Sequence, residues 1–302
     1  MPPTPQPSRK SPPANWGRWG KDDERGALNL LTPAVIRAAT KVCKTGVVYS
    51  LALPIKSGFP PKGYRKPPQR ATLLSGDRFA KIDPESKEVY GAEDYYTIAS
   101  HFGTHMDSLA HVWQGAHLYN GFPGDSLTVA EGAQRCGIDK QSWIVARGVM
   151  LDMARQMDVA TVPAGYAFSS KELLACAKRQ GVALRSGDAL LVRTGWMRGY
   201  KKDPAAMDHG EAGIGLEACA LIKAKGICAV GSDNAAIEPI PWTKGQFLAV
   251  HIELLRNQGV PLLELLDLEQ LAADSVYEFL LVVAPLRVEG GTGSPINPIA
   301  IA

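Results

Sequence analysis

Histidines are rare in this sequence but concentrated in one segment. Four of the six fall within seventeen residues, at His101, His105, His111 and His117. The first two are four apart, a spacing that on a helix resembles the zinc-binding HExxH pattern. A helix is disfavoured because Gly103 and Thr104 are poor helix formers, no glutamate follows the first histidine, and the preceding YYTIAS has strand character. We therefore predict an extended segment.

Extended backbone places residues that are two apart on the same face. His101, His105 and Asp107 would then converge, with Gly103 leaving a gap between the side chains. Two imidazoles and a carboxylate form a workable ligand set for Zn or Mn and leave positions open for water. The alternative is a pair of ordinary strand histidines beside a turn aspartate. Three candidate ligands on one face favour the metal site.

The segment HFGTHMDSLAH also resembles the HxGTHxDxPxH signature of the cyclase family, metal-dependent hydrolases that include kynurenine formamidases, isatin hydrolases and a trans-dienelactone hydrolase. Six signature positions match, and Leu109 replaces the usual proline, which should alter the local turn more than the ligands. The similarity continues at residues 15–29, 187–196 and 291–301. The chain length and the NWGRWG block favour the isatin-hydrolase branch over the shorter formamidases.

The resemblance implies specific roles for the histidine segment. His101, His105 and Asp107 correspond to the family's metal ligands, and His111 to its acid/base residue. A histidine near a metal-bound water suits proton transfer, because its unperturbed pKa lies near 6.5. His117 is predicted to be a surface-loop histidine, since its spacing does not relate it to the others.

A later segment, residues 247–268, is a candidate second half of the site. His251 shares a predicted helix face with Phe247 and two leucines, so we expect it to point inward. Glu264 lies among leucines, where a carboxylate is costly unless it is paired or bound to a cation. The short kynurenine formamidases hold a second zinc with a similar His and Glu, so a second metal remains open; the alternative is a core His and a surface Glu.

Aromatic side chains flank the signature and could form a pocket wall. Trp113 follows the catalytic candidate, and Tyr95 and Tyr96 precede the ligand segment. Trp113 and Tyr96 are the substrate-binding candidates, with core packing as the alternative for either one. Polar, glycine-containing loops at residues 231–239 and 290–295 could present backbone amides to a carboxylate or oxyanion.

The rest of the chain predicts an α/β protein. Strands are expected at residues 47–53, 95–100, 143–151, 189–194, 227–231 and 279–283, and helices at 33–42, 171–179, 216–225 and 246–258. The strand order is not predictable. The family resemblance implies a single cyclase-like domain with a mixed, barrel-like sheet flanked by helices, and we assign it to residues 15–302.

Composition narrows the function classes. The 302 residues are 45% hydrophobic with a formal charge of +3, so a folded enzyme-sized domain is expected and nucleic acid is not an expected partner. Five spaced cysteines without a CxxC pair favour a reducing compartment. Residues 1–14 are predicted to be a disordered arm, and residues 57–70 a loop or an arm on a neighbouring subunit. A cytoplasmic homodimer or homotetramer, not bound to membrane, is expected.

The predicted reaction is hydrolysis of a small cyclic amide, imide or lactone by metal-activated water, with His111 as general base. A metal-dependent lyase or cyclase and an open-chain arylformamidase are the alternative enzymes. A non-catalytic metal-binding or interaction protein is a third class, and the presence of His111 beside three ligand candidates argues against it.

Overall fold

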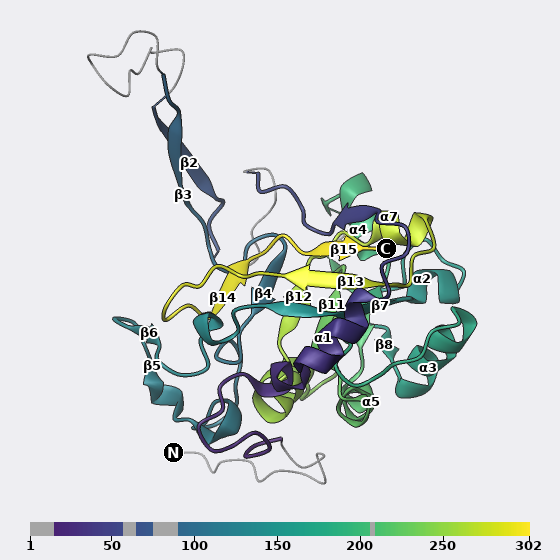
Figure 1. Cartoon of the computed structure of the whole chain (residues 1–302), viewed down its shortest axis with the longest axis horizontal. Helices are drawn as coiled ribbons and strands as arrows, with labels where there is room; N and C mark the ends of the chain where they lie inside the picture. The colour runs from purple at the N-terminus through teal and green to yellow at the C-terminus, as the bar shows by residue number, and fades with distance from the viewer. Residues whose placement is uncertain (1–14, 57–64, 75–89, 206–208) are drawn as a thin grey trace.

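The computed structural model of the protein describes residues 15–56, 65–74, 90–205 and 209–302. They form one α/β domain around a curled mixed sheet (Figure 1). The arm expected at residues 1–14, and most of the loop expected at 57–70, lie outside the described residues. In the described part of the chain, no helix combines the length and apolarity needed to cross a bilayer.

The sheet has nine strands, parallel in the middle and antiparallel at both sides. In spatial order they are β1 (Val48–Ser50), β15 (Ile299–Ile301), β13 (Glu278–Val283), β7 (Ile144–Asp152), β9 (Ala189–Arg193), β11 (Ala229–Ser232), β12 (Leu262–Glu264), β4 (His105–Asp107) and β14 (Gly293–Pro295). The four strands β7, β9, β11 and β12 are parallel, so their carboxyl ends lie along one edge of the sheet. Ligands of α/β proteins commonly bind beyond such an edge.

Both faces of the sheet are buried. On β9, Leu190 packs into one hydrophobic cluster and Leu191 into another, as expected for alternating strand residues. The first cluster includes side chains from α3 (Ser170–Arg179) and α5 (Cys219–Lys225), and the second contacts α1 (Pro33–Thr40) (Figure 1). Burial on both faces explains why β9 is apolar up to its last residue and why β7 is mostly apolar, with Arg147 paired to Asp188.

Four predicted strands, at residues 143–151, 189–194, 227–231 and 279–283, correspond to β7, β9, β11 and β13. The strand predicted at 47–53 is shorter, at β1. The remaining strands are the pairs β2 (Gln69–Leu74) with β3 (Glu93–Thr97), β5 (Leu127–Thr128) with β6 (Gly132–Ala133), and β8 (Ala167–Phe168) with β10 (Gly213–Ile214).

The helices predicted at 33–42 and 171–179 correspond to α1 and α3. A capping box between Ser169 and Glu172 begins α3. Residues 216–225 form the 3₁₀ turn η7 (Leu216–Ala218) followed by α5. The other helical elements are α2 (Met153–Gln156), α4 (Trp196–Lys202), α6 (Ala249–His251), α7 (Glu269–Ala273), the π-helix η8 (Ile252–Gln258) and the 3₁₀ turns η1 (Gly26–Leu30), η3 (Tyr119–Gly121), η4 (Gly124–Ser126) and η5 (Ile138–Lys140).

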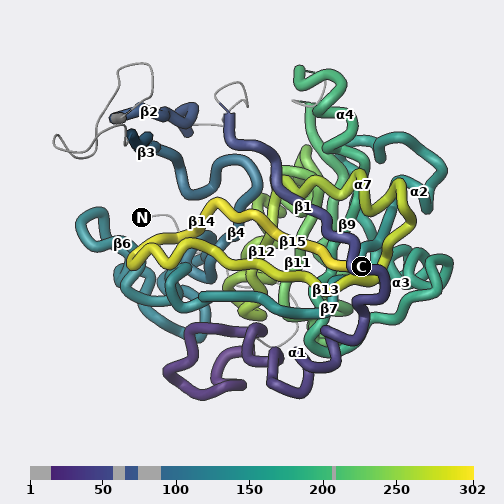
Figure 2. Tube along the Cα trace, turned by 45° about the horizontal axis from the view of Figure 1, so that its top comes forward, coloured from purple at the N-terminus to yellow at the C-terminus, as the bar shows by residue number. Residues whose placement is uncertain are grey.

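Two predictions about elements near the site were wrong. The strand expected at 95–100 ends at Thr97 and belongs to the β2–β3 hairpin, which stands away from the central sheet (Figures 1 and 2). The helix expected from residue 246 begins at Ala249, because Leu248 has a positive φ of 50°. Phe247 therefore does not share the buried face of His251 and is 64% exposed.

Candidate metal centre

The signature segment is a turn followed by a short strand, and the extended stretch predicted from His101 onward was wrong. Regular pairing begins only at His105, where β4 lies between β12 and β14. Gly103 has a φ of +63°, and an added Cβ there would meet no atom within 4 Å. Glycine is therefore suited to this position by its backbone conformation, and not by the gap that we predicted.

Thr104 ties this turn to the sheet. Its Oγ1 donates a hydrogen bond of 2.6 Å to the carbonyl of Leu265 and accepts one of 2.8 Å from the backbone N–H of Leu53. Leu265 directly follows Glu264, the residue paired with His105 across β12 and β4. The threonine of the signature thus fixes the position of the turn relative to the second half of the site.

Hydrogen bonds at Nδ1 orient the two imidazoles. The Nδ1 of His105 lies 2.7 Å from the carbonyl oxygen of Gly103, and that of His101 lies 3.0 Å from Ser100 Oγ. Both Nε2 atoms consequently face Asp107. Gly293, on β14, is also required here, because an added Cβ would lie 2.4 Å from His101 Nε2.

Asp107 is the centre of the cluster and is fully buried. Its Oδ1 lies 3.4 Å from His101 Nε2, 3.5 Å from His105 Nε2 and 3.9 Å from His111 Nε2. The ring of His111 stacks on that of His101 with centroids 3.8 Å apart. The structure therefore brings together all four residues that the signature indicated.

The second half of the site joins the same cluster. Glu264 Oε2 lies 3.1 Å from His105 Nε2, and its Oε1 lies 3.2 Å from His251 Nε2. His251 Nε2 is also 3.9 Å from Asp107 Oδ2. Both His251 and Glu264 are buried, so the expectation that His251 points inward is confirmed and the surface alternative for Glu264 is wrong.

Burial lowers the pKa of His101 and of His111 to about 3, so both imidazoles are neutral at pH 7 and keep a lone pair. Burial raises the pKa of Asp107, and the nearby Glu264 carboxylate raises it further. Burial also opposes the charge of Glu264, but contacts with His105 and His251 outweigh it and lower this pKa.

His251 is held by a carboxylate that the sequence analysis missed. Glu238 Oε1 lies 2.6 Å from His251 Nδ1 and accepts a hydrogen bond from the backbone N–H of the same residue. Burial opposes a charge on His251, yet contacts with Glu238 and Glu264 raise its pKa to about 10. Glu238 lies thirteen residues before its partner, a separation that carries no periodic signal.

The donor set fits a cation. In the described part of the chain, several buried atoms of the cluster have no hydrogen-bond partner, namely His101 Nε2, His105 Nε2, Asp107 Oδ1 and Oδ2, and Glu264 Oε1. Leaving a buried polar atom unsatisfied costs about 1–3 kcal/mol. Ligand atoms from two overlapping triads, one of His101, Asp107 and His111 and the other of His105, Asp107 and Glu264, each lie within 4.8 Å of one another. Imidazole and carboxylate donors in this arrangement suit a divalent metal.

Comparisons with known proteins agree with this geometry. A family model described as "Putative cyclase" matches residues 49–239. A crystal structure described as a novel cyclase is 35% identical, and the match covers 96% of this chain and 98% of that chain with a TM-score of 0.89. This chain belongs to the cyclase family.

More distant structures share the cyclase fold. Isatin hydrolase A from Labrenzia aggregata, bound to benzyl benzoate, is 19% identical over 84% of this chain and 93% of that chain, with a TM-score of 0.60. A "predicted metal-dependent hydrolase" from Bacillus stearothermophilus is 19% identical over 84% of this chain and 97% of that one, with a TM-score of 0.51. A search of curated proteins gives no match.

The aromatic candidates occupy different places in this cyclase domain. Trp113 is half-buried against the main hydrophobic cluster, and an added Cβ at Gly124 would lie 2.9 Å from its Nε1. Tyr96 is 68% exposed on the hairpin and lines a cavity there with Arg70 and Ile98. The proposed contact of either residue with substrate stays a prediction. His117 is exposed, as predicted for a surface-loop residue.

Each of the two polar loops places one residue at the histidine cluster, and the predicted role of their backbone amides stays a prediction. Residues 231–239 supply Glu238, while Asp233 in the same loop accepts hydrogen bonds from Thr194 and Gly195. Residues 290–295 supply Gly293, whose lack of a Cβ leaves room for the His101 ring. Burial raises the pKa of Asp233 to about 6, although the Thr194 hydrogen bonds oppose this shift.

Proposed function

We propose that this cyclase-family protein is a metal-dependent hydrolase that opens small cyclic amides, imides or lactones. The observation that carries the proposal is the convergence of two histidines and two fully buried carboxylates whose facing atoms have no hydrogen-bond partner among the described residues. Such a cluster is unfavourable as a purely structural core, because each unsatisfied buried group reduces the free energy of unfolding.

His101, His105 and Asp107 are the proposed ligands of the first metal, Zn or Mn. Glu264 and His251, with Asp107 shared between the two sets, are the proposed ligands of a second. A divalent metal in this position supplies an activated water and polarises the carbonyl of the substrate. The chain's own contribution is to hold the imidazoles by their Nδ1 atoms and to bury both carboxylates, which strengthens their interaction with a cation.

His111 is the proposed general base. Its side chain is one-fifth exposed, whereas that of His105 is only 1% exposed, so His111 faces the accessible side of the cluster. Stacking on His101 fixes its ring beside the cluster, which is the position needed by a group that accepts a proton from the water and returns it to the leaving nitrogen or oxygen. Trp113, two residues further along, is the proposed surface for a planar ring.

A substrate panel tests the reaction class. We expect a higher kcat/KM for strained or electron-poor lactams, imides and lactones than for the open-chain N-formylkynurenine, because the sequence similarity favours the isatin-hydrolase branch. The opposite ranking would replace this substrate class with an arylformamidase. Turnover in ¹⁸O-labelled water must place the label in the product if the reaction is hydrolysis, and unlabelled product would favour a lyase or cyclase.

A further inference from the structure

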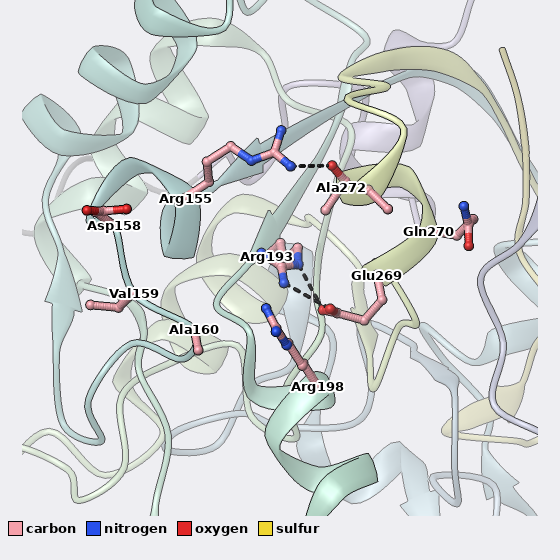
Figure 3. Close-up of a pocket in the computed structure, with 10 residues that line it drawn as sticks. Arg155, Asp158, Val159, Ala160, Arg193, Arg198, Glu269, Gln270 and Ala272 are labelled. Carbon is pink, nitrogen blue, oxygen red and sulfur yellow. Dashed lines mark hydrogen bonds and ion pairs between the residues drawn. The ribbon is translucent and has the colours of Figure 1, made fainter.

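A second pocket lies at the carboxyl ends of β7 and β9, where the chain continues into α2 and α4. Its volume is about 640 Å³. It shares no residue with the histidine cluster, and it is bordered on another side by α7 (Figure 3). Three arginines line it, namely Arg155, Arg193 and Arg198.

Arg193 forms the inner wall, and its guanidinium nitrogens donate hydrogen bonds to carboxylates. Its Nε and Nη2 donate to the two carboxylate oxygens of Glu269 at 2.8 and 2.9 Å, and its Nη1 donates to Asp152 at 2.8 Å. Only 7% of its side chain is exposed. Because the fork of Arg193 uses both Glu269 oxygens, that carboxylate is neutralised within the wall.

Arg155 is also anchored. Its Nη2 donates to the carbonyl of Ala272 at 2.6 Å, as Figure 3 shows, and its Nη1 donates to Ser275 and Tyr277. Its Nε lies 3.6 Å from Asp152, the carboxylate shared with Arg193. The two arginines and two carboxylates of the inner wall therefore balance in charge.

Arg198 is different from the other two. Within the described residues it forms no hydrogen bond or ion pair, and it is exposed at the pocket. Figure 3 shows its guanidinium pointing toward Arg193 and Glu269, while Asp158 lies on the far side of the pocket beside Val159. The end of the pocket at Arg198 thus carries an uncompensated positive charge.

We propose that this pocket binds a small oxyanion, a carboxylate or phosphate group, through the guanidinium of Arg198. A planar guanidinium can offer two parallel N–H donors to either group. The carboxylates of the inner wall are already paired with Arg155 and Arg193 and so do not neutralise Arg198. Val159, Ala160 and Ala272 provide apolar surface for a short carbon chain. The site does not depend on the proposed hydrolase activity, because the two regions have no residue in common.

Calorimetric titration of the metal-loaded protein with inorganic phosphate and, separately, with succinate tests this site. We expect at least one probe to bind, and Arg198→Ala to weaken it by about tenfold or more, since hydrogen bonds to charged groups are among the stronger ones. Arg287→Ala is the matched control, because Arg287 is another exposed arginine without an ion pair among the described residues. It should bind like the wild type.

The two probes identify the ligand class. If only phosphate binds, the ligand is a phosphate. If only succinate binds, the ligand is a carboxylate. If both bind, the site recognises the oxyanion group that the two probes share. Any oxyanion bound by the metal centre would persist in Arg198→Ala, so the difference between wild type and variant isolates the pocket. The proposal is overturned if neither probe binds, if Arg198→Ala keeps wild-type affinity, or if Arg287→Ala weakens binding equally.

Discussion

Two buried, charged regions lie near the same edge of the sheet, and they satisfy their carboxylates in opposite ways. The Arg193 guanidinium donates hydrogen bonds to both oxygens of Glu269 and to one oxygen of Asp152, and the other Asp152 oxygen lies 3.6 Å from Arg155 Nε. Around Asp107, the neighbours are imidazoles, of which His101 and His111 are neutral at pH 7, and neither Asp107 oxygen has a hydrogen-bond partner among the described residues. Buried charge that the chain neutralises itself supports the fold, whereas charge that it leaves unsatisfied indicates a place for a ligand.

The largest effect is expected at His111, which lies at the accessible side of the unsatisfied region. His111→Ala should reduce turnover by about 10²- to 10⁴-fold, the usual contribution of a general acid/base group, while metal content stays near normal. Steady-state kinetics and elemental analysis of the same preparation measure both quantities. Full activity would remove His111 from the mechanism, and loss of metal would make it a ligand instead.

In the satisfied region, Arg193→Met should act on stability alone. Removing the guanidinium leaves Asp152 buried with fewer donors, which should lower the free energy of unfolding by about 3 kcal/mol. Urea denaturation measures this change. The metal content of the folded variant should equal that of the wild type, and a parallel loss of metal would show that the two regions are not separable.

The smallest effect is expected from Glu238, which touches the cluster only through His251. Glu238→Gln should weaken binding of the second metal, whose proposed ligands include His251, by about 10- to 100-fold. The reason is that a carboxylate hydrogen-bonded to a metal-ligating histidine orients its ring. Competition with a chromophoric chelator measures the affinity. Glu269→Gln is the control in the satisfied region and should leave the affinity unchanged; unchanged affinity in Glu238→Gln would exclude His251 as a ligand.

The sequence predicted the four signature residues correctly as neighbours because they lie within eleven positions, where chain connectivity alone restricts their separation. It misjudged the reason, since Gly103 provides a positive φ in a turn and not a gap in a strand. Propensity could not reveal that turn. Local apolar runs also predicted the central strands β7 and β9, which are buried on both faces.

Long-range pairing could not be predicted. Glu264 reaches His105 because three-residue strands β12 and β4 pair side by side, and strands this short give no periodic pattern. Glu238 was missed because its contact with His251 depends on how a loop folds back over a helix start. Similarly, Gly293 shows its role only when His101 is placed against it.

Metal analysis of the purified protein tests the central claim most directly. Elemental analysis combined with anomalous diffraction should find at least one equivalent of Zn or Mn between His101, His105 and Asp107. Prolonged chelation should abolish turnover, and Asp107→Ala should prevent metal uptake. A protein with only trace metal, and with activity that chelators do not change, would contradict the assignment of this cluster as a metal centre.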